Sequence, residues 1–278
     1  MKHGTGINYY PSGKIKDSTQ FKSGARAGKQ IQYYENGNIQ GINFYIEDKL
    51  NGICSYFYDN KKPKAIFTYE SGKKTGKQTT YYPSGNTKSI EVLNKVHQQL
   101  SLKEFSTEGK LISETTFTYQ EVPNFTDKLV TLKHIVLKNE QTGKKTTIEN
   151  YYNQEKHGDF IYYRIDGKMK LKETYRFGNL NGERIVYFEN GKVKVKEYYL
   201  AGRKVNTWFS YYENGKIEET TTYKKDKKEG LEKTYFENGE LKSEGFYLKD
   251  KKHGVWKSYN NEGEKIKSEK YSKGELKK

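Results

Sequence analysis

Tyr33-Tyr34-Glu35-Asn36-Gly37 is one copy of a short motif, an aromatic pair followed by a turn, that recurs along the 278-residue chain. The copies are 24 residues apart in two series, one starting at Tyr9 and the other at Tyr163. The first residues of the copies are Tyr9, Tyr33, Phe57, Tyr81, Phe105, Tyr163, Tyr187, Tyr211, Tyr235 and Tyr259. A fixed period of this length is typical of repeat proteins, in which each repeat is one supersecondary unit.

Each repeat has two halves, because a second aromatic residue follows twelve residues after most anchors and is itself followed by a turn. Between turns, apolar and polar residues alternate, as in Gln30-Ile31-Gln32-Tyr33, which is the period of a β-strand. Asn-Gly after an aromatic pair predicts a hairpin turn whose two central residues both have positive φ. We therefore predict an all-β fold of some twenty strands. Tandem 24-residue β-hairpin repeats would form an elongated, twisted antiparallel sheet, a solenoid-like ribbon.

The composition favours a thin sheet over a compact core. Only 32% of the residues are hydrophobic, and 26 residues are Tyr. Aliphatic residues are too few to fill a large interior, whereas aromatic residues are too frequent for a disordered chain. Tyrosine suits a single layer, because its ring is buried while its hydroxyl reaches water. We expect no pocket on such a ribbon.

The repeat loses its phase between Phe105 and Tyr163, which divides the chain into three parts. Residues 1–112 form a first repeat array, 113–157 an irregular junction with degenerate repeats, and 158–278 a second array. The junction region is rich in aliphatic residues, and residues 101–150 contain seven basic and seven acidic side chains. It is either a structural joint or a surface that binds a partner. The candidate partner-binding residues are Val122, Leu129, Leu132, Ile135 and Leu137.

No constellation of residues in the sequence indicates catalysis. Cys54 is the only cysteine, and its neighbours read as a strand, so we expect a structural role. His157 and His253 occupy the same place in repeats four periods apart and are too distant to share a metal. We therefore assign no catalytic residue, no metal and no cofactor, and expect that the protein is not an enzyme.

The net charge of +16 favours acidic partners, such as an anionic membrane surface or nucleic acid. Lysines gather at two turns of the second array. The candidate contacts to an anionic surface are Lys224, Lys225, Lys227, Lys228, Lys251 and Lys252. Their simpler interpretation is solvated turns. Nucleic acid is disfavoured, because arginine is scarce beside lysine and the aromatic residues are those that the repeat itself needs.

The repeat also carries a family resemblance. Tyr211-Tyr212-Glu213-Asn214-Gly215-Lys216-Ile217 and Lys252-His253-Gly254-Val255-Trp256 resemble the bacterial MORN-repeat variant of the YwqK type, which is often labelled a toxin–antitoxin antitoxin. The resemblance implies single-layer hairpin sheets that mediate protein assembly, sometimes contact phospholipid, and carry no catalytic residues. We expect a non-enzymatic protein-binding scaffold, with antitoxin-like neutralisation of a partner protein. A peripheral scaffold on anionic lipid is the alternative, and nucleic-acid binding is the third hypothesis.

Localisation and self-association follow from the ends of the chain. No run approaches 18 apolar residues, and Met1-Lys2-His3-Gly4 begins no hydrophobic signal core. The sequence as it stands predicts a cytoplasmic protein, or an exported or surface-attached one if a signal peptide had been removed. Both ends cut the repeat, so we expect either exposed end strands that pair with another copy or a chain trimmed from a longer protein.

Overall fold

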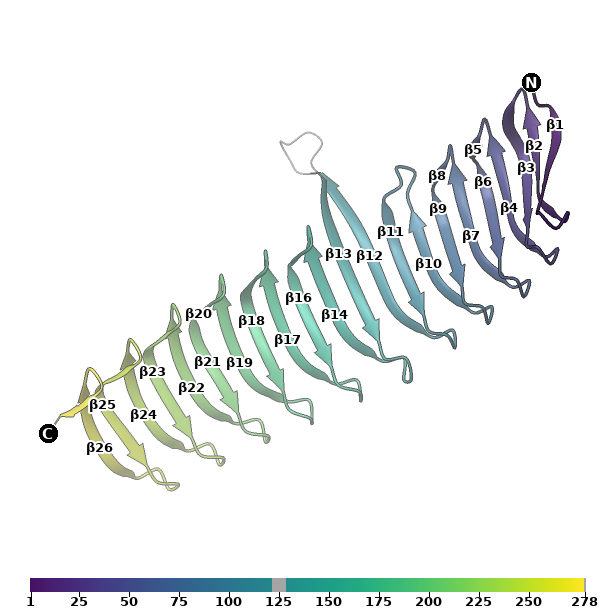
Figure 1. The fold of residues 1–278 in the computed structure, drawn as a ribbon. Helices are drawn as coiled ribbons and strands as arrows, with labels where there is room; N and C mark the ends of the chain where they lie inside the picture. The colour runs from purple at the N-terminus through teal and green to yellow at the C-terminus, as the bar shows by residue number, and fades with distance from the viewer. Residues whose placement is uncertain (122–128, 278) are drawn as a thin grey trace. The chain divides into compact units, whose positions relative to one another are not determined.

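The computed structural model describes residues 1–121 and 129–277, and these contain strands and turns but no helix (Figure 1). All paired strands are antiparallel, and the 27 strands belong to one sheet. Strands that follow one another along the chain pair, as β1 with β2 and β2 with β3. Where a two-residue strand intervenes, the strand before it pairs both with it and with the strand after it, as β4 does with β5 and β6. The prediction of an all-β protein built from tandem hairpins is confirmed.

The chain divides into two compact units, which are described separately. The first unit comprises Met1–Tyr119 and Ile135–Gly143, and the second comprises Gln120–His134 and Lys144–Lys278. The first eleven strands are β1 (Gly4–Tyr9), β2 (Ile15–Lys22), β3 (Ala25–Tyr33), β4 (Ile39–Ile46), β5 (Lys49–Leu50), β6 (Gly52–Phe57), β7 (Pro63–Glu70), β8 (Lys73–Lys74), β9 (Gly76–Tyr81), β10 (Thr87–Leu93) and β11 (Gln99–Phe105).

The division between the units splits β12 (Leu111–Glu121) and β13 (Leu129–Lys138). The strands that follow are β14 (Lys145–Tyr152), β15 (Glu155–Lys156), β16 (Gly158–Tyr163), β17 (Met169–Arg176), β18 (Asn179–Tyr187), β19 (Val193–Leu200), β20 (Arg203–Lys204), β21 (Asn206–Tyr211), β22 (Ile217–Lys224), β23 (Lys227–Tyr235), β24 (Leu241–Leu248), β25 (Lys251–Tyr259), β26 (Lys265–Ser272) and β27 (Glu275–Lys277).

The Asn-Gly turn differs from the predicted one. Of its two central residues only Gly37 has positive φ, at 89°. The Gly37 N–H donates to the Tyr34 carbonyl at 2.9 Å, and the strand register shifts between Gln32 and Tyr33. These features define a type I turn closed by a glycine bulge. Asn36 contributes to the turn through its side chain, because its Oδ1 accepts the backbone N–H of Asn38 at 2.9 Å.

The turn with two positive φ values lies at the other end of each hairpin. Ser23 and Gly24, at φ 52° and 89°, join the paired residues Lys22 and Ala25. This is the geometry of a two-residue type I′ turn. Asp226 and Asp250 occupy the second position of such turns at φ 72° and 66°. The two ends of each hairpin therefore use different turn chemistry.

The number of strands exceeds the prediction because bulges interrupt the longer strands. In the second repeat the Asn51 N–H donates to the Phe44 carbonyl at 2.8 Å, and Gly52 follows with φ 87°. The interruption separates the two-residue strand β5 from β6. The same break separates β8 from β9, β15 from β16 and β20 from β21.

The most buried side chains gather on one face of the sheet, which we call the inner face. In the first unit a cross-strand row on this face contains Thr19, Gln30 and Asn43. Gln30 Nε2 donates to Thr19 Oγ1 at 2.9 Å, and Asn43 Nδ2 donates to Gln30 Oε1 at 3.1 Å. Cys54 is fully buried on the next strand, and burial raises the pKa of its thiol, consistent with a structural role. The core of a single layer thus includes polar groups that bond one another, although Asn43 Oδ1 is buried without a hydrogen-bond partner.

A ladder of tyrosine hydroxyls joins successive repeats. In each case the second aromatic residue of the motif donates from its hydroxyl to the backbone carbonyl 23 residues later. The donor–acceptor pairs are Tyr10–Tyr33 (2.7 Å), Tyr34–Phe57 (2.8 Å), Tyr58–Tyr81 (2.8 Å), Tyr82–Phe105 (2.9 Å) and Tyr212–Tyr235 (2.7 Å). The aromatic pair of the motif therefore has a specific use where its second residue is tyrosine: the hydroxyl connects that repeat to the next.

Candidate functional site

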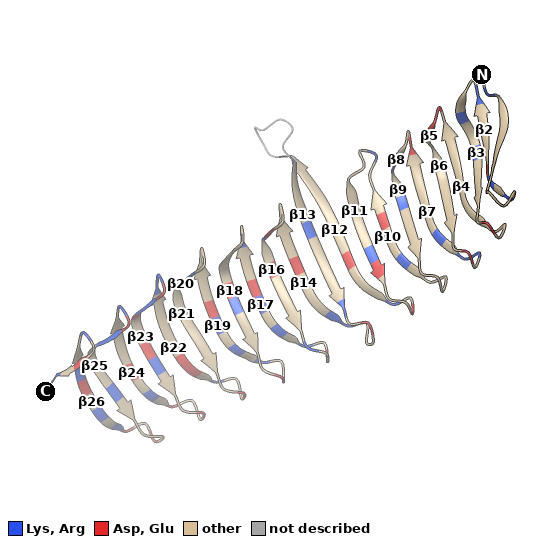
Figure 2. Cartoon of the chain, viewed as in Figure 1, with Lys and Arg blue, Asp and Glu red and all other residues tan. Residues whose placement is uncertain are grey.

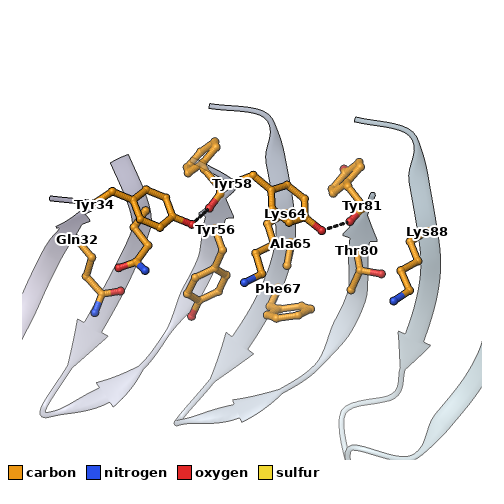
Figure 3. A pocket seen from close by; sticks show the side chains of 12 residues that line it. Gln32, Tyr34, Tyr56, Tyr58, Lys64, Ala65, Phe67, Thr80, Tyr81 and Lys88 are labelled. Atoms are coloured by element: carbon orange, nitrogen blue, oxygen red, sulfur yellow. Dashed lines mark hydrogen bonds between the residues drawn. The ribbon is translucent and has the colours of Figure 1, made fainter. Parts of the chain in front are cut away.

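The first unit has a groove of about 530 Å³, which the sequence-based expectation of a ribbon without pockets did not foresee (Figure 3). Its walls come from β3, β4, β6, β7, β9, β10 and the turns after β3 and β6. The lining residues are Gln32, Tyr34, Gln40, Tyr56, Phe57, Tyr58, Lys64, Ala65, Phe67, Thr80, Tyr81 and Lys88. The groove therefore runs across the strands. A thin sheet forms it because the large side chains rise from the turn region and leave space between them.

The lining repeats with the period of the sequence. Gln32, Tyr56 and Thr80 are 24 residues apart on β3, β6 and β9. In Figure 3 the rings of Tyr34 and Tyr58 hold corresponding places in successive hairpins. A third set consists of Gln40, Lys64 and Lys88, which stand seven residues after the anchors Tyr33, Phe57 and Tyr81. The groove is thus lined by equivalent positions of successive hairpin repeats, although the residue types at these positions differ.

The tyrosines that line the groove are held rigidly. Their hydroxyls are occupied, since Tyr34 and Tyr58 donate to the carbonyls of Phe57 and Tyr81. The Lys64 ammonium lies 5.8 Å from the centre of the Tyr58 ring, which is within cation–π range. Lys88 lies 5.9 Å from the centre of the Tyr82 ring in the same way. The aromatic groups therefore provide fixed apolar surface, and the two lysines provide positive charge beside it.

The charge in the groove is of one sign. The lining residues include Lys64 and Lys88 but no Asp or Glu, and both lysines are exposed. Among the described residues, no carboxylate lies within ion-pair distance of either ammonium. Burial raises the pKa of Tyr56, and the neighbouring Tyr69 raises it further, so its phenol stays neutral. These groups are suited to binding an acidic ligand.

The predicted partner-binding surface in the middle of the chain remains a prediction. Val122 lies outside the described residues, and Leu129 begins β13 without a described side chain. Leu132, Ile135 and Leu137 lie on β13 and are half-buried. Strand alternation places Ile135 and Leu137 on one face and Leu132 on the other. These three leucine and isoleucine residues therefore do not share one surface of the sheet.

The six lysines of the predicted anionic-surface contact separate into two groups. Lys224, Lys225, Lys227 and Lys251 are exposed near the type I′ turns, where Figure 2 marks basic residues. Lys228 instead bonds Glu232 at 2.5 Å and lies 4.9 Å from the Tyr247 ring. Lys252 lies 4.2 Å from the Trp256 ring and 5.1 Å from the Tyr271 ring. The latter two lysines thus pack within the protein.

Other kinds of site receive no support in the part of the chain that the structure describes. Residues 1–121 and 129–277 contain no group of three or more His, Cys, Asp or Glu side chains placed to hold a metal ion. Over the same ranges, no helix has the length and apolarity needed to cross a membrane.

Sequence reasoning missed the groove, although a signal for it exists. Lysine recurs seven residues after the anchor at Lys16, Lys64, Lys88, Lys194 and Lys242. Each of these lies 5.5–5.9 Å from the ring of the second aromatic residue of its repeat. A lysine at a fixed repeat position beside an aromatic pair thus indicates a ring–cation pair rather than a solvated side chain. Which pairs border a groove depends on the neighbouring residues as well.

Comparison with known proteins identifies the repeat. A sequence model of the family described as the MORN repeat variant matches seven segments that together cover more than half of the chain. The matched residues are 2–23, 26–47, 50–71, 74–93, 180–201, 204–225 and 228–249. A comparison with curated proteins gave no significant match. One similar solved structure, titled "Crystal Structure of TcdB2-TccC3", aligns over 96% of this chain at 13% identity with a TM-score of 0.22, and this chain spans 17% of that one.

Proposed function

The chain belongs to the MORN repeat variant family, and we propose that it is a non-enzymatic scaffold that binds a protein partner in the groove of its first unit. MORN repeats are generally associated with binding and scaffold roles. The observation that carries the proposal is the groove itself. It combines rigid aromatic rings with two exposed lysines and has no acidic residue in its lining. Aromatic anchors in a preformed groove are the groups that contribute most to protein recognition.

The proposal is tested by photo-crosslinking in a lysate of the source cells. A photo-reactive phenylalanine analogue at position 40 lies in the groove, where Gln40 is exposed. The matched control carries the analogue at position 194, which is the same repeat position in the second array. We expect a discrete protein adduct from position 40 that is absent from position 194. Equal labelling from both positions, or no protein adduct at all, would contradict a partner site in the groove.

A finer proposal is that the bound partner is a toxic protein that the scaffold neutralises, as in an antitoxin. It is supported by the resemblance of the repeats and by the length of the groove, which would cover an extended segment of a partner. Co-expression of the crosslinked partner with the parent protein should restore growth, whereas the Lys64→Gln/Lys88→Gln variant should not. Equal growth with both would remove the groove from the neutralising role.

Binding to an anionic membrane surface is a second candidate function, favoured by the exposed lysines at the type I′ turns of the second unit. Lys224, Lys225, Lys227 and Lys251 are exposed, although Lys224 also forms an ion pair with Glu229 at 3.5 Å, and each basic residue near such a surface contributes about 1 kcal/mol. Co-sedimentation with vesicles of phosphatidylserine and phosphatidylcholine should weaken when these four are changed to Gln. Lys228 and Lys252 pack on rings, so their substitution should affect stability rather than vesicle binding.

A further inference from the structure

Equivalent groups recur along the groove at a fixed distance, which restricts the backbone conformation of a ligand that lies in it. Neighbouring strands lie about 4.8 Å apart, and each 24-residue repeat contributes two strands, so equivalent groups recur about every 9.6 Å along the sheet. Tyr34 and Tyr58 are one such pair, and Lys64 and Lys88 are another. A ligand lying along the groove meets the Tyr34 and Tyr58 rings one step apart and the Lys64 and Lys88 ammonium groups one step apart. Its own side chains must recur at the same distance to use them all.

Polyproline II is the regular peptide conformation whose period agrees with this step. It has three residues per turn and rises about 3.1 Å per residue, so every third side chain points the same way at intervals of about 9.3 Å. A β-strand returns to the same face at about 6.6 or 13.2 Å, which does not match. An α-helix returns to one face after seven residues, at about 10.5 Å, which is closer.

The length of the groove and the chemistry of its lining favour the extended chain over the helix. The lining residues span six neighbouring strands, or roughly 24 Å. The polyproline II period of about 9.3 Å is nearer to the repeat step of about 9.6 Å than the helical period of about 10.5 Å, so its side chains stay closer to the step over this length. Aromatic-lined grooves are also the usual receptors for polyproline II segments.

The charges specify which side chains the extended chain carries. Lys64 and Lys88 are one repeat apart, are exposed, and have no carboxylate partner among the described residues. Gln40 stands at the same position in the preceding repeat and offers an amide donor. Acidic side chains three residues apart would meet these groups in succession.

We infer that the groove binds a polyproline II segment with an acidic side chain at every third residue, running across strands β3 to β10. This inference rests on the proposed protein-binding function and adds the conformation and sequence pattern of the ligand. The repeat supplies the spacing, the tyrosines supply the apolar surface, and Lys64 and Lys88 supply the charge complement. Because polyproline II is preformed, the segment loses little conformational entropy on binding.

Two labelled peptides of equal composition test the inference by fluorescence anisotropy with the full chain. The first is four repeats of Glu-Pro-Pro, in which every glutamate shares one face. The second has four consecutive glutamates followed by eight prolines, so its charge is the same but its phase is not. We expect the periodic peptide to bind at least about tenfold more tightly. Equal affinity of the two peptides would overturn the inference.

Single Lys→Gln variants inside and outside the groove show where the periodic peptide binds. Lys64→Gln and Lys88→Gln should each weaken the periodic peptide about three- to tenfold, because each removes one charge-assisted contact. The fold accepts the change, since Gln40 occupies the equivalent position naturally. Lys194→Gln and Lys242→Gln remove lysines from the same repeat position outside the groove and should leave the affinity unchanged. Equal effects of all four would mean non-specific attraction to a basic protein and would refute the site.

The remaining outcomes separate this inference from the proposed function. A protein adduct at position 40 together with equal peptide affinities would retain the partner site and reject the polyproline II ligand. Absence of both the adduct and peptide binding would reject the partner site and the polyproline II ligand together. Displacement of the periodic peptide by an oligothymidylate of equal charge, at equal concentration, would assign the groove to nucleic acid and overturn the inference.

Discussion

At the scale of single residues, the second aromatic of each motif determines whether two repeats share a hydroxyl bond. Tyr212 donates to the Tyr235 carbonyl at 2.7 Å, whereas the next repeat has Phe236 at that position. The chain therefore contains both the bonded and the unbonded form of one contact. The contribution of this hydrogen bond to the free energy of unfolding can therefore be measured without disturbing the packing of the ring.

We predict that Tyr212→Phe lowers the free energy of unfolding by about 1 kcal/mol, because a part-buried carbonyl loses its donor. Phe236→Tyr should raise it by a similar or smaller amount, because the new hydroxyl meets the Tyr259 carbonyl. Urea denaturation of each variant beside the parent measures both. If Phe236→Tyr destabilises the protein while Tyr212→Phe has no effect, the hydroxyl ladder does not stabilise the repeats.

Gly245 shows how closely a residue on the inner face is packed. A Cβ atom built at this position would come within 2.0 Å of the Trp256 ring, which is itself 7% exposed. Gly245→Ala should therefore displace the indole and cost about 1–3 kcal/mol, the usual range for overpacking. Denaturation together with a red shift of tryptophan fluorescence measures the change. In a Trp256→Leu background the same substitution should cost much less, and an equal cost would place its cause elsewhere.

At the scale of elements, the type I′ turns of the second unit bind the preceding repeat through a carboxylate. Asp250 has φ 66°, and its Oδ1 accepts the backbone N–H of Lys228 at 2.8 Å. Asp226 accepts the Lys204 N–H at 2.8 Å in the same way. The equivalent turns at Gly24 and Gly72 have no side chain for this bond. The acidic residues among the turn lysines are therefore structural.

We predict that Asp250→Ala lowers the free energy of unfolding by about 1–3 kcal/mol, since it removes an acceptor and leaves an ordinary side chain at positive φ. Asp250→Gly should cost less, because glycine accepts this backbone conformation. Thermal denaturation of the two variants gives the order. If alanine and glycine at position 250 prove equivalent, φ strain contributes nothing at this turn.

The elements also show how far the sequence could predict the structure. The 24-residue period and the alternation of Gln30-Ile31-Gln32-Tyr33 predicted the hairpins correctly, because these patterns reflect local pairing and burial. The turn type at Asn36-Gly37 was predicted wrongly, since the same dipeptide fits a type I turn with a glycine bulge when the asparagine bonds its own backbone. The choice between these turns depends on the strands that flank them.

The groove could not be predicted for a different physical reason. It depends on the distance between equivalent side chains of neighbouring repeats, and Lys64 and Lys88 face space left by Thr80 and Ala65. In the repeat pattern, these lysines look like those at any other hairpin. Lys228 and Lys252 illustrate the reverse error, because they read as turn lysines but pack on aromatic rings. Side-chain environment is set across strands, where a one-dimensional pattern is least informative.

At the scale of the whole molecule, stability comes from contacts between adjacent repeats. Within residues 1–121 and 129–277, the backbone ladders and the tyrosine hydroxyl bonds that the structure describes connect neighbouring repeats, as expected for a repeat protein. A change in pH that ionises tyrosines at equivalent positions therefore affects several repeats at once. In the second unit, burial and then a hydrogen bond to Glu149 raise the pKa of Tyr151 to about 12, and burial and Glu173 raise that of Tyr175 to about 12. For Tyr199 burial and the Glu197 charge have the same effect, to about 12.

We predict that the second unit loses stability as the pH rises from 10 to 12. Each of these phenols is held neutral in the folded protein, at a pKa above the ordinary value of 10.0. Their stabilising contribution is therefore complete below pH 10 and disappears as the pH passes through the folded values. The variant Tyr151→Phe/Tyr175→Phe/Tyr199→Phe should show a smaller loss over this range. Circular dichroism with tyrosinate absorbance follows both forms, and Tyr9→Phe, at an exposed residue, is the control. An unchanged loss in the triple variant would mean that other groups cause the alkaline unfolding.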